Sequence, residues 1–142
     1  MRTLWIFITI CTISLSLTGC SGAGKPEDTV KEYLKRASTY DIAGLKKLCT
    51  GEAWKSLDDM AADIDVDKVM VENTQKVEKE GQRHWADVES RYDITVQDNT
   101  SSSATVLVIS GEQKVTFDLI MMEGSWKIDR ISNPNFGLTP IK

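Results

Sequence analysis

The chain has 142 residues, a length that suits one folded domain rather than two. Hydrophobic residues make up 41% and charged residues 27% of the sequence, which argues against disorder throughout the chain. The formal net charge is −4 and no block of basic residues occurs, which argues against binding to nucleic acid or, through a polybasic segment, to anionic lipid.

The first 20 residues are arranged as a secretory signal peptide. Arg2 and the terminal amine supply positive charge, residues 4–17 form an apolar run without charge, glycine or proline, and small residues then lead to Cys20. As a helix this run would span ~21 Å, whereas the hydrocarbon core of a bilayer is ~30 Å thick. The sequence therefore predicts a cleaved leader rather than a permanent transmembrane helix.

The end of this leader, Leu17-Thr18-Gly19-Cys20, resembles the lipobox of bacterial lipoprotein precursors. The resemblance implies cleavage between Gly19 and Cys20, so that a lipidated Cys20 becomes the first residue of the mature protein and anchors it to the membrane of the cell envelope. Two or three acyl chains, palmitate among them, meet the physical requirement for stable anchoring. In a Gram-negative organism, Ser21 in place of Asp implies the outer membrane. The alternative is a secreted protein that is cleaved elsewhere.

Four segments follow from this interpretation: a signal peptide over residues 1–19, the lipidated cysteine with a flexible tether over 20–25, a folded domain over 26–132 and a tail over 133–142. The Gly- and Ser-rich tether has an expected span of ~12 Å, so the domain should stay close to the bilayer. Cys49 is the remaining cysteine of the mature chain, because Cys11 lies in the leader. No intramolecular disulfide and no cysteine-based metal site is then expected, and its helical spacing from Leu45 and Leu48 predicts a buried thiol.

The first part of the domain predicts helices. Pro26 suits a first helical turn, Glu27 and Asp28 place negative charge at its positive end, and apolar residues recur at helical spacing over residues 26–39. A second short helix, capped by Asp41, should end near Gly51. A third is expected over residues 52–63, with these residues on one side: Ala53, Trp54, Leu57, Met60 and Ala61. A charged helix over residues 65–79 fits the pattern less well.

Beyond Gly81 the apolar period changes from 3.6 to 2, which predicts strands. The alternating segments are residues 90–98, 103–110, 114–122 and 125–132, joined by short connections that favour hairpins. The sequence therefore predicts an α+β domain whose N-terminal helices pack on a four-stranded antiparallel meander sheet.

This order of elements resembles the cone-shaped nuclear-transport-factor-two-like (cystatin-like) superfamily, particularly its small lumazine-binding-like bacterial lipoproteins with a domain of unknown function. The matching stretches are residues 26–49, 101–109 and 124–131. They are patterns of structural type, so the resemblance implies a fold and not an activity.

Few residues point to chemistry. Tyr33, Trp54, Trp85 and Trp126 could line an apolar pocket, although filling the core is the simpler interpretation. His84, the single histidine, has no evident partner for acid–base catalysis, and no calcium-binding loop surrounds the carboxylate pairs. The sequence therefore predicts no catalytic residue, metal or cofactor.

Both faces of the central strands are apolar, since Leu107, Ile109, Ile120 and Met122 alternate along the strands with a second apolar set: Val106, Val108, Leu119 and Met121. Either the tail, through Phe136, Leu138 and Ile141, or a second protomer should cover the outer face.

Three functional hypotheses remain open. The first is a lipid-anchored envelope protein whose non-enzymatic domain binds a small apolar ligand or an envelope protein. The others are a small enzyme that uses the cone interior as a shielded pocket, and an interaction or dimerisation module that works through the outer sheet face.

Overall fold

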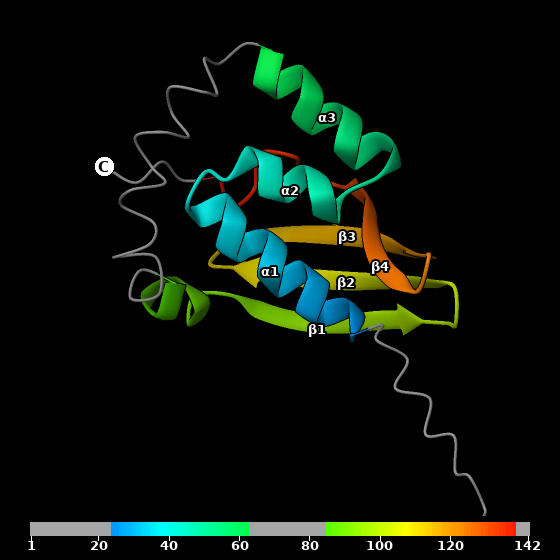
Figure 1. The fold of residues 1–142 in the computed structure, drawn as a ribbon. Helices are drawn as coiled ribbons and strands as arrows, with labels where there is room; N and C mark the ends of the chain where they lie inside the picture. Colours follow the sequence, from blue (N-terminus) through cyan, green and yellow to red (C-terminus); the bar gives the residue numbers. More distant parts are fainter. Residues whose placement is uncertain (1–23, 63–84, 139–142) are drawn as a thin grey trace, which may run out of the picture.

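Three helices precede a four-stranded antiparallel sheet in the computed structural model, which describes residues 24–62 and 85–138 (Figure 1). The helices are α1 (Pro26–Ser38), α2 (Ile42–Leu48) and α3 (Gly51–Ala62). The strands are β1 (Asp93–Asn99), β2 (Ser103–Ser110), β3 (Gln113–Met122) and β4 (Ser125–Ile131), with a short helix over residues 85–89 before β1. The predicted α+β class is thereby confirmed, while the predicted helix over residues 65–79 lies outside the described residues.

Helix α1 follows directly from its sequence. Pro26 begins it, and the Asp28 carboxylate accepts a hydrogen bond from the Lys25 amide at 3.3 Å, which satisfies a donor at the helix start. Its apolar positions, spaced three or four residues apart, form a fully buried stripe on the sheet. The helix ends where the Ser38 and Thr39 hydroxyls turn back to donate to backbone carbonyls.

Helix α2 is capped as the sequence predicts. The Asp41 carboxylate accepts from the Gly44 amide at 2.9 Å, and its other oxygen accepts from the Arg36 guanidinium at 2.8 Å. Both side chains occupy the space that a Cβ on Gly44 would need, so a larger residue there would displace the Asp41–Arg36 pair.

The chain between α2 and α3 runs beside β4. Cys49 forms a parallel bridge with Ile128, and the Thr50 amide donates to the Ile128 carbonyl at 2.8 Å. Gly51 then begins α3 with a φ of +52°, and the Asp129 carboxylate lies where a Cβ would stand. A residue with a side chain is disfavoured here for both reasons.

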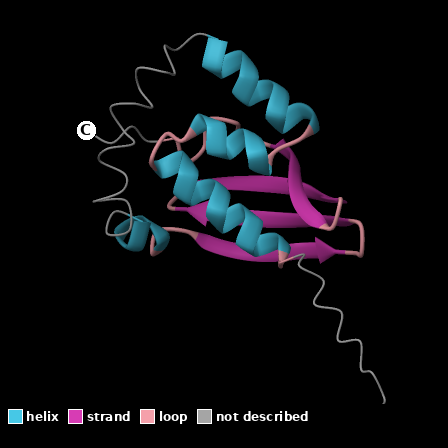
Figure 2. Ribbon diagram, in the orientation of Figure 1, coloured by secondary structure: helices cyan, strands magenta, loops and turns pink. Residues whose placement is uncertain are grey.

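The strands pair in the order β1-β2-β3-β4, with irregular pairing between Val96 and Asp98 and between Asp118 and Leu119. The helices cover one face of the sheet (Figure 2). Alternate residues of β2, β3 and β4 point to this face and form the core with the buried stripe of α1, as in the cross-strand pairs Val106–Phe117 and Leu119–Ile128.

The segment after β4 belongs to the helix side of the sheet. Phe136 is 5% exposed, lies 5.8 Å from the Tyr92 ring in an edge-on arrangement and is part of the core, and Leu138 packs against that core. The expectation that these two residues cover the outer sheet face is therefore wrong, because both find apolar partners on the inner side. Ile141 lies outside the described residues.

Candidate functional site

Within the part of the chain that the structure describes, two ionisable side chains are buried in the core, Tyr33 and Cys49. Tyr33 lies on α1 with no exposed surface, and its ring packs edge-on against Phe117 with centroids 5.5 Å apart. Its hydroxyl has no hydrogen-bond partner among the described residues. Burial, with a smaller contribution from the nearby Cys49, raises the pKa of Tyr33 well above its usual value.

Cys49 follows α2 and is 6% exposed, as the sequence predicted. Burial raises the pKa of Cys49 to about 12, although the positive charge of Lys127 acts in the opposite direction. The thiol therefore stays protonated at neutral pH. Because the thiolate is the reactive form, the buried Cys49 thiol packs here as an apolar group.

The four aromatic residues that could line a pocket do not meet in one place. Tyr33 and Trp126 are buried in the core, whereas Trp85 is half-buried and stacks on Tyr92 with centroids 6.4 Å apart. Trp54 is 42% exposed, so the expectation that it belongs to the buried side of α3 is wrong. The helix packs through Ala53 and Leu57 and leaves the indole at the edge of the contact.

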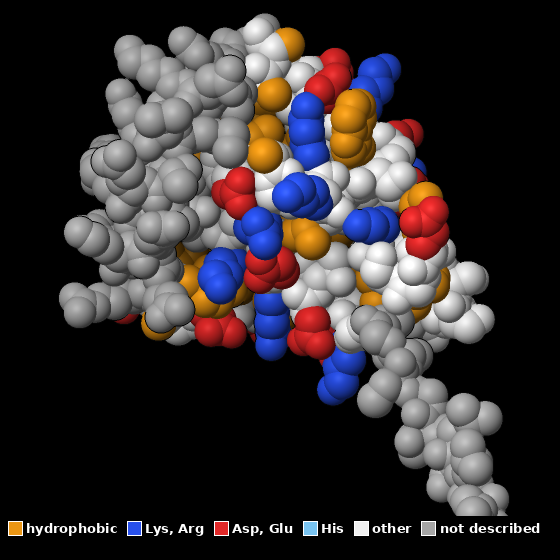
Figure 3. Space-filling view, viewed as in Figure 1, with side chains coloured by type: hydrophobic (Ala, Val, Ile, Leu, Met, Phe, Trp, Pro, Cys, Tyr) orange, Lys and Arg blue, Asp and Glu red, His pale blue; other side chains and the backbone are white. Residues whose placement is uncertain are grey.

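Trp54 belongs to a surface that the sequence did not reveal. The Lys46 ammonium lies 5.0 Å from the centroid of the indole and also pairs with Asp58. Lys47 follows Lys46 in α2 and is exposed. The backbone carbonyl of Lys47 accepts a hydrogen bond from the Lys127 ammonium of β4. We call Trp54, Lys46, Lys47 and Lys127 the Trp54–lysine surface. Figure 3 shows basic side chains gathered over the helical face of the domain, with acidic and apolar groups among them.

The outer face of the sheet is apolar only at its two ends. The register places Leu107 and Ile109 towards the β2–β3 turn, while Ile120 and Met122 lie towards the opposite end of β3. Between the two ends, the carboxylate of Asp118 accepts from the Thr105 hydroxyl at 3.2 Å and from Arg130 at 3.0 Å. This polar cluster divides the outer face, so its apolar residues do not form one continuous patch.

Two negative findings concern the described part of the chain alone. It contains no group of three or more His, Cys, Asp or Glu side chains that could hold a metal ion, and His84 and Cys20 lie outside it. None of its helices has the length and apolar composition needed to span a bilayer.

Comparison with protein-family models found no match, and neither the curated proteins nor the solved structures yielded a similar protein.

Proposed function

We propose that this chain is a lipid-anchored protein of the bacterial cell envelope whose small non-enzymatic domain binds a ligand or a protein partner at its surface. The observation that carries the proposal is the position of Leu17-Thr18-Gly19-Cys20 at the end of an apolar leader, immediately before the fold. The first helix begins at Pro26, so only residues 21–25 separate the acylated cysteine from the domain.

The filled interior supports binding at the surface. Tyr33, Leu34 and Phe117, which meet between the helices and the sheet, have no exposed surface. A ligand that entered between these layers would have to displace close-packed side chains, at a cost of several kcal/mol for each large residue moved out of contact. The buried, protonated Cys49 gives no support to the alternative of an enzyme with a shielded pocket.

The third hypothesis is an interaction module that works through the outer face of the sheet. The apolar residues of the strands favoured it in the sequence, but the arrangement of that face supports it less well. A docking surface is expected to present a contiguous apolar patch. Here the Asp118–Arg130 pair separates Leu107 and Ile109 from Ile120, so a second protomer would have to cover a charged pair at the centre of the contact.

We also propose a distant relationship to the nuclear-transport-factor-two-like superfamily. Its support is the order of elements, with helices first and a hairpin-linked sheet after them, together with the coverage of one sheet face by helices. This relationship bears on ancestry and shape, and no residue of any relative's active site is carried over with it.

The intact mass of the protein extracted from membranes tests the anchoring. We expect a chain that begins at Cys20 and carries the added mass of a diacylglyceryl group. An unmodified chain cleaved at another position would contradict the proposal. Native mass spectrometry of the same material tests the binding, for which we expect a retained small molecule or protein. An acylated chain that turns over a substrate through an ionisable residue of its interior would contradict the non-enzymatic part.

A further inference from the structure

The Trp54–lysine surface combines an exposed indole with positive charge from both layers of the domain. Trp54 is 42% exposed, and Met122, at 41%, is the other large hydrophobic side chain of the described residues that is exposed to this extent. We propose that this surface binds an acidic segment of a protein partner, with an apolar side chain of that segment against the Trp54 indole. The inference rests on the proposed binding function and adds to it a surface and the chemistry of the partner.

The indole is ordered by contacts within the domain. The Lys46 ammonium of α2 lies 5.0 Å from the centroid of the ring and also pairs with the Asp58 carboxylate. Asp58 is four residues after Trp54 in α3, so these two side chains are neighbours on the surface of the helix. A side chain that is already ordered loses less conformational entropy when a partner binds, and tryptophan is one of the residues that most often dominate the affinity of an interface. Trp54 is therefore suited to the centre of a contact.

The two lysines of α2 point in different directions. Lys46 and Lys47 are consecutive, and consecutive residues of a helix are ~100° apart around its axis. Lys46 turns towards α3, where it meets Trp54 and Asp58, whereas Lys47 is exposed. Because the two ammonium groups diverge, they do not form a compact site for one small anion. They suit a partner whose negative charges are spread along a chain.

Lys127 extends the positive charge from the helices to the sheet. It lies in β4, and its ammonium donates a hydrogen bond to the Lys47 carbonyl near the end of α2. This bond uses one N–H of the ammonium and leaves two donors for other acceptors. Asp58 neutralises Lys46, so Lys47 and Lys127 leave the surface with a net positive charge. The surface is therefore complementary to carboxylates.

The edge of β4 beside this surface is already occupied by backbone. Cys49 forms a parallel bridge with Ile128, the residue after Lys127, and the Thr50 amide donates to the Ile128 carbonyl. A partner strand cannot add to the sheet at this point, because the hydrogen-bonding groups of Ile128 are taken. The partner therefore has to be recognised through side chains, which is what an indole and several ammonium groups provide.

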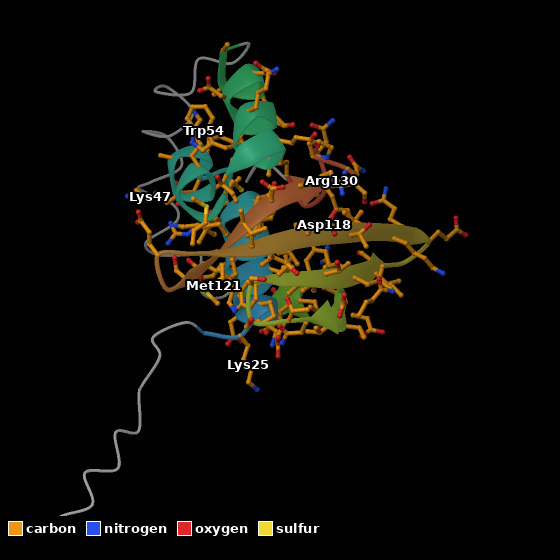
Figure 4. All side chains as sticks on the ribbon, turned by 90° about the vertical axis from the view of Figure 1, so that its right-hand side faces the viewer. Lys25, Lys47, Trp54, Asp118, Met121 and Arg130 are labelled. Atoms are coloured by element: carbon orange, nitrogen blue, oxygen red, sulfur yellow. The ribbon has the colours of Figure 1, made fainter. Side chains whose placement is uncertain are left out.

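The acidic net charge of the chain does not oppose an acidic partner here. The formal net charge is −4, but charges further than ~8 Å away are largely screened at physiological ionic strength. Figure 4 shows Trp54 and Lys47 towards one side of the domain, apart from Asp118 and Arg130 of the outer sheet face. The charges of the local surface therefore decide which partner fits.

Peptide binding tests the inference on the protein purified from membranes and placed in nanodiscs of neutral phosphatidylcholine. The probe is a fluorescein-labelled synthetic peptide of glutamate residues with one central phenylalanine, and its fluorescence anisotropy reports binding. We expect binding that weakens as salt is added, because the attraction is between charges. The control peptide carries glutamine in place of each glutamate and should bind more weakly.

Two substitutions locate the contact. Trp54→Ala should weaken binding by about tenfold or more, as expected of an interface anchor, and Lys47→Glu by about fivefold. Lys47 is changed because Lys127 also holds the end of α2. Lys114→Glu is the matched control and should leave the affinity as it is. Lys114 lies in β3 six residues before Ile120, the partner of Lys127, which is ~20 Å along the strand. Circular dichroism checks that each variant is folded.

The outcomes separate this inference from the proposed function. Equal affinities of the wild type, Trp54→Ala and Lys47→Glu would overturn the surface and leave a binding function standing. A protein that ignores the acidic peptide but retains another molecule in native mass spectrometry would overturn the acidic partner alone. Tighter binding to phosphatidylglycerol vesicles than to the peptide, lost in the same two variants, would overturn the protein partner in favour of lipid. A protein that binds neither the peptide nor any retained molecule would contradict the proposed binding function as well.

Discussion

Replacement of Tyr33 by phenylalanine should stabilise the domain. The Tyr33 hydroxyl is fully buried and has no hydrogen-bond partner among the described residues. A buried polar group without a partner costs about 1–3 kcal/mol relative to one that is hydrogen-bonded. The phenylalanine ring keeps the edge-on contact with Phe117, which contributes about 0.5–1.5 kcal/mol beyond its buried area. We therefore expect the free energy of unfolding to rise by about 1 kcal/mol or more.

Urea unfolding of the unacylated mature chain, followed by circular dichroism, measures this change. The midpoint should move to higher urea with an unchanged slope, which identifies an effect on stability rather than on compactness. Tyr33→Leu serves as the control, because it removes the hydroxyl and also the aromatic contact, and it should be less stable than Tyr33→Phe. A loss of 1 kcal/mol or more in Tyr33→Phe, about the net value of one hydrogen bond, would refute the reasoning. It would show that the hydroxyl is bonded to a water molecule, a ligand or a residue outside the described part.

Three further predictions concern Cys49, the start of α3 and the segment after β4. Burial raises the pKa of Cys49 from its ordinary value of 9.0 to about 12, so above pH 9 the unfolded thiol loses its proton first and stability falls by up to about 1.4 kcal/mol per pH unit. Unfolding measured between pH 9 and pH 12 should show a shallower decline for Cys49→Ala, and equal slopes would contradict the burial. Gly51 has a positive φ, and an added Cβ would clash with the Asp129 carboxylate, so Gly51→Ala should lower the free energy of unfolding by about 1–2 kcal/mol or more. Thermal unfolding should show part of this loss recovered in the double variant Gly51→Ala/Asp129→Ala. Phe136→Ala should cost about 3–5 kcal/mol in urea unfolding, whereas the exposed Asn135→Ala should stay within about 0.5 kcal/mol; similar small effects of both would place Phe136 outside the core.

Local sequence patterns predicted the elements that depend on local physics. The period of apolar residues and the acidic first turn located α1 to within a residue of its end, and Asp41 caps α2 as expected. Alternation along β2 and β3 separated the two faces of the sheet correctly, because successive side chains of a strand point in opposite directions.

The surfaces could not be predicted, because they join segments that are distant in the sequence. Lys47 and Lys127 meet through a hydrogen bond between the end of α2 and β4. Asp118 and Arg130 lie side by side only in the β3–β4 register. Trp54 shares the apolar stripe of α3 in sequence, but the helix buries Ala53 and Leu57 and leaves the indole 42% exposed.

The position of the segment after β4 could not be predicted from the sequence either. The apolar residues after β4 suggested a cover for the outer face, since the sequence gives no direction for the chain beyond the last strand. In the structure, Phe136 and Leu138 turn towards α1 and Tyr92, where more apolar surface is available to bury.

Metabolic labelling with palmitate tests the central claim, the lipid anchor at Cys20, most directly. Wild-type protein and Cys20→Ala are produced in the same bacterial host, immunoprecipitated and compared for incorporated label. We predict label in the wild type and none in Cys20→Ala, which should also accumulate with its leader uncleaved. Equal labelling of the two proteins, or none in either, would contradict the account.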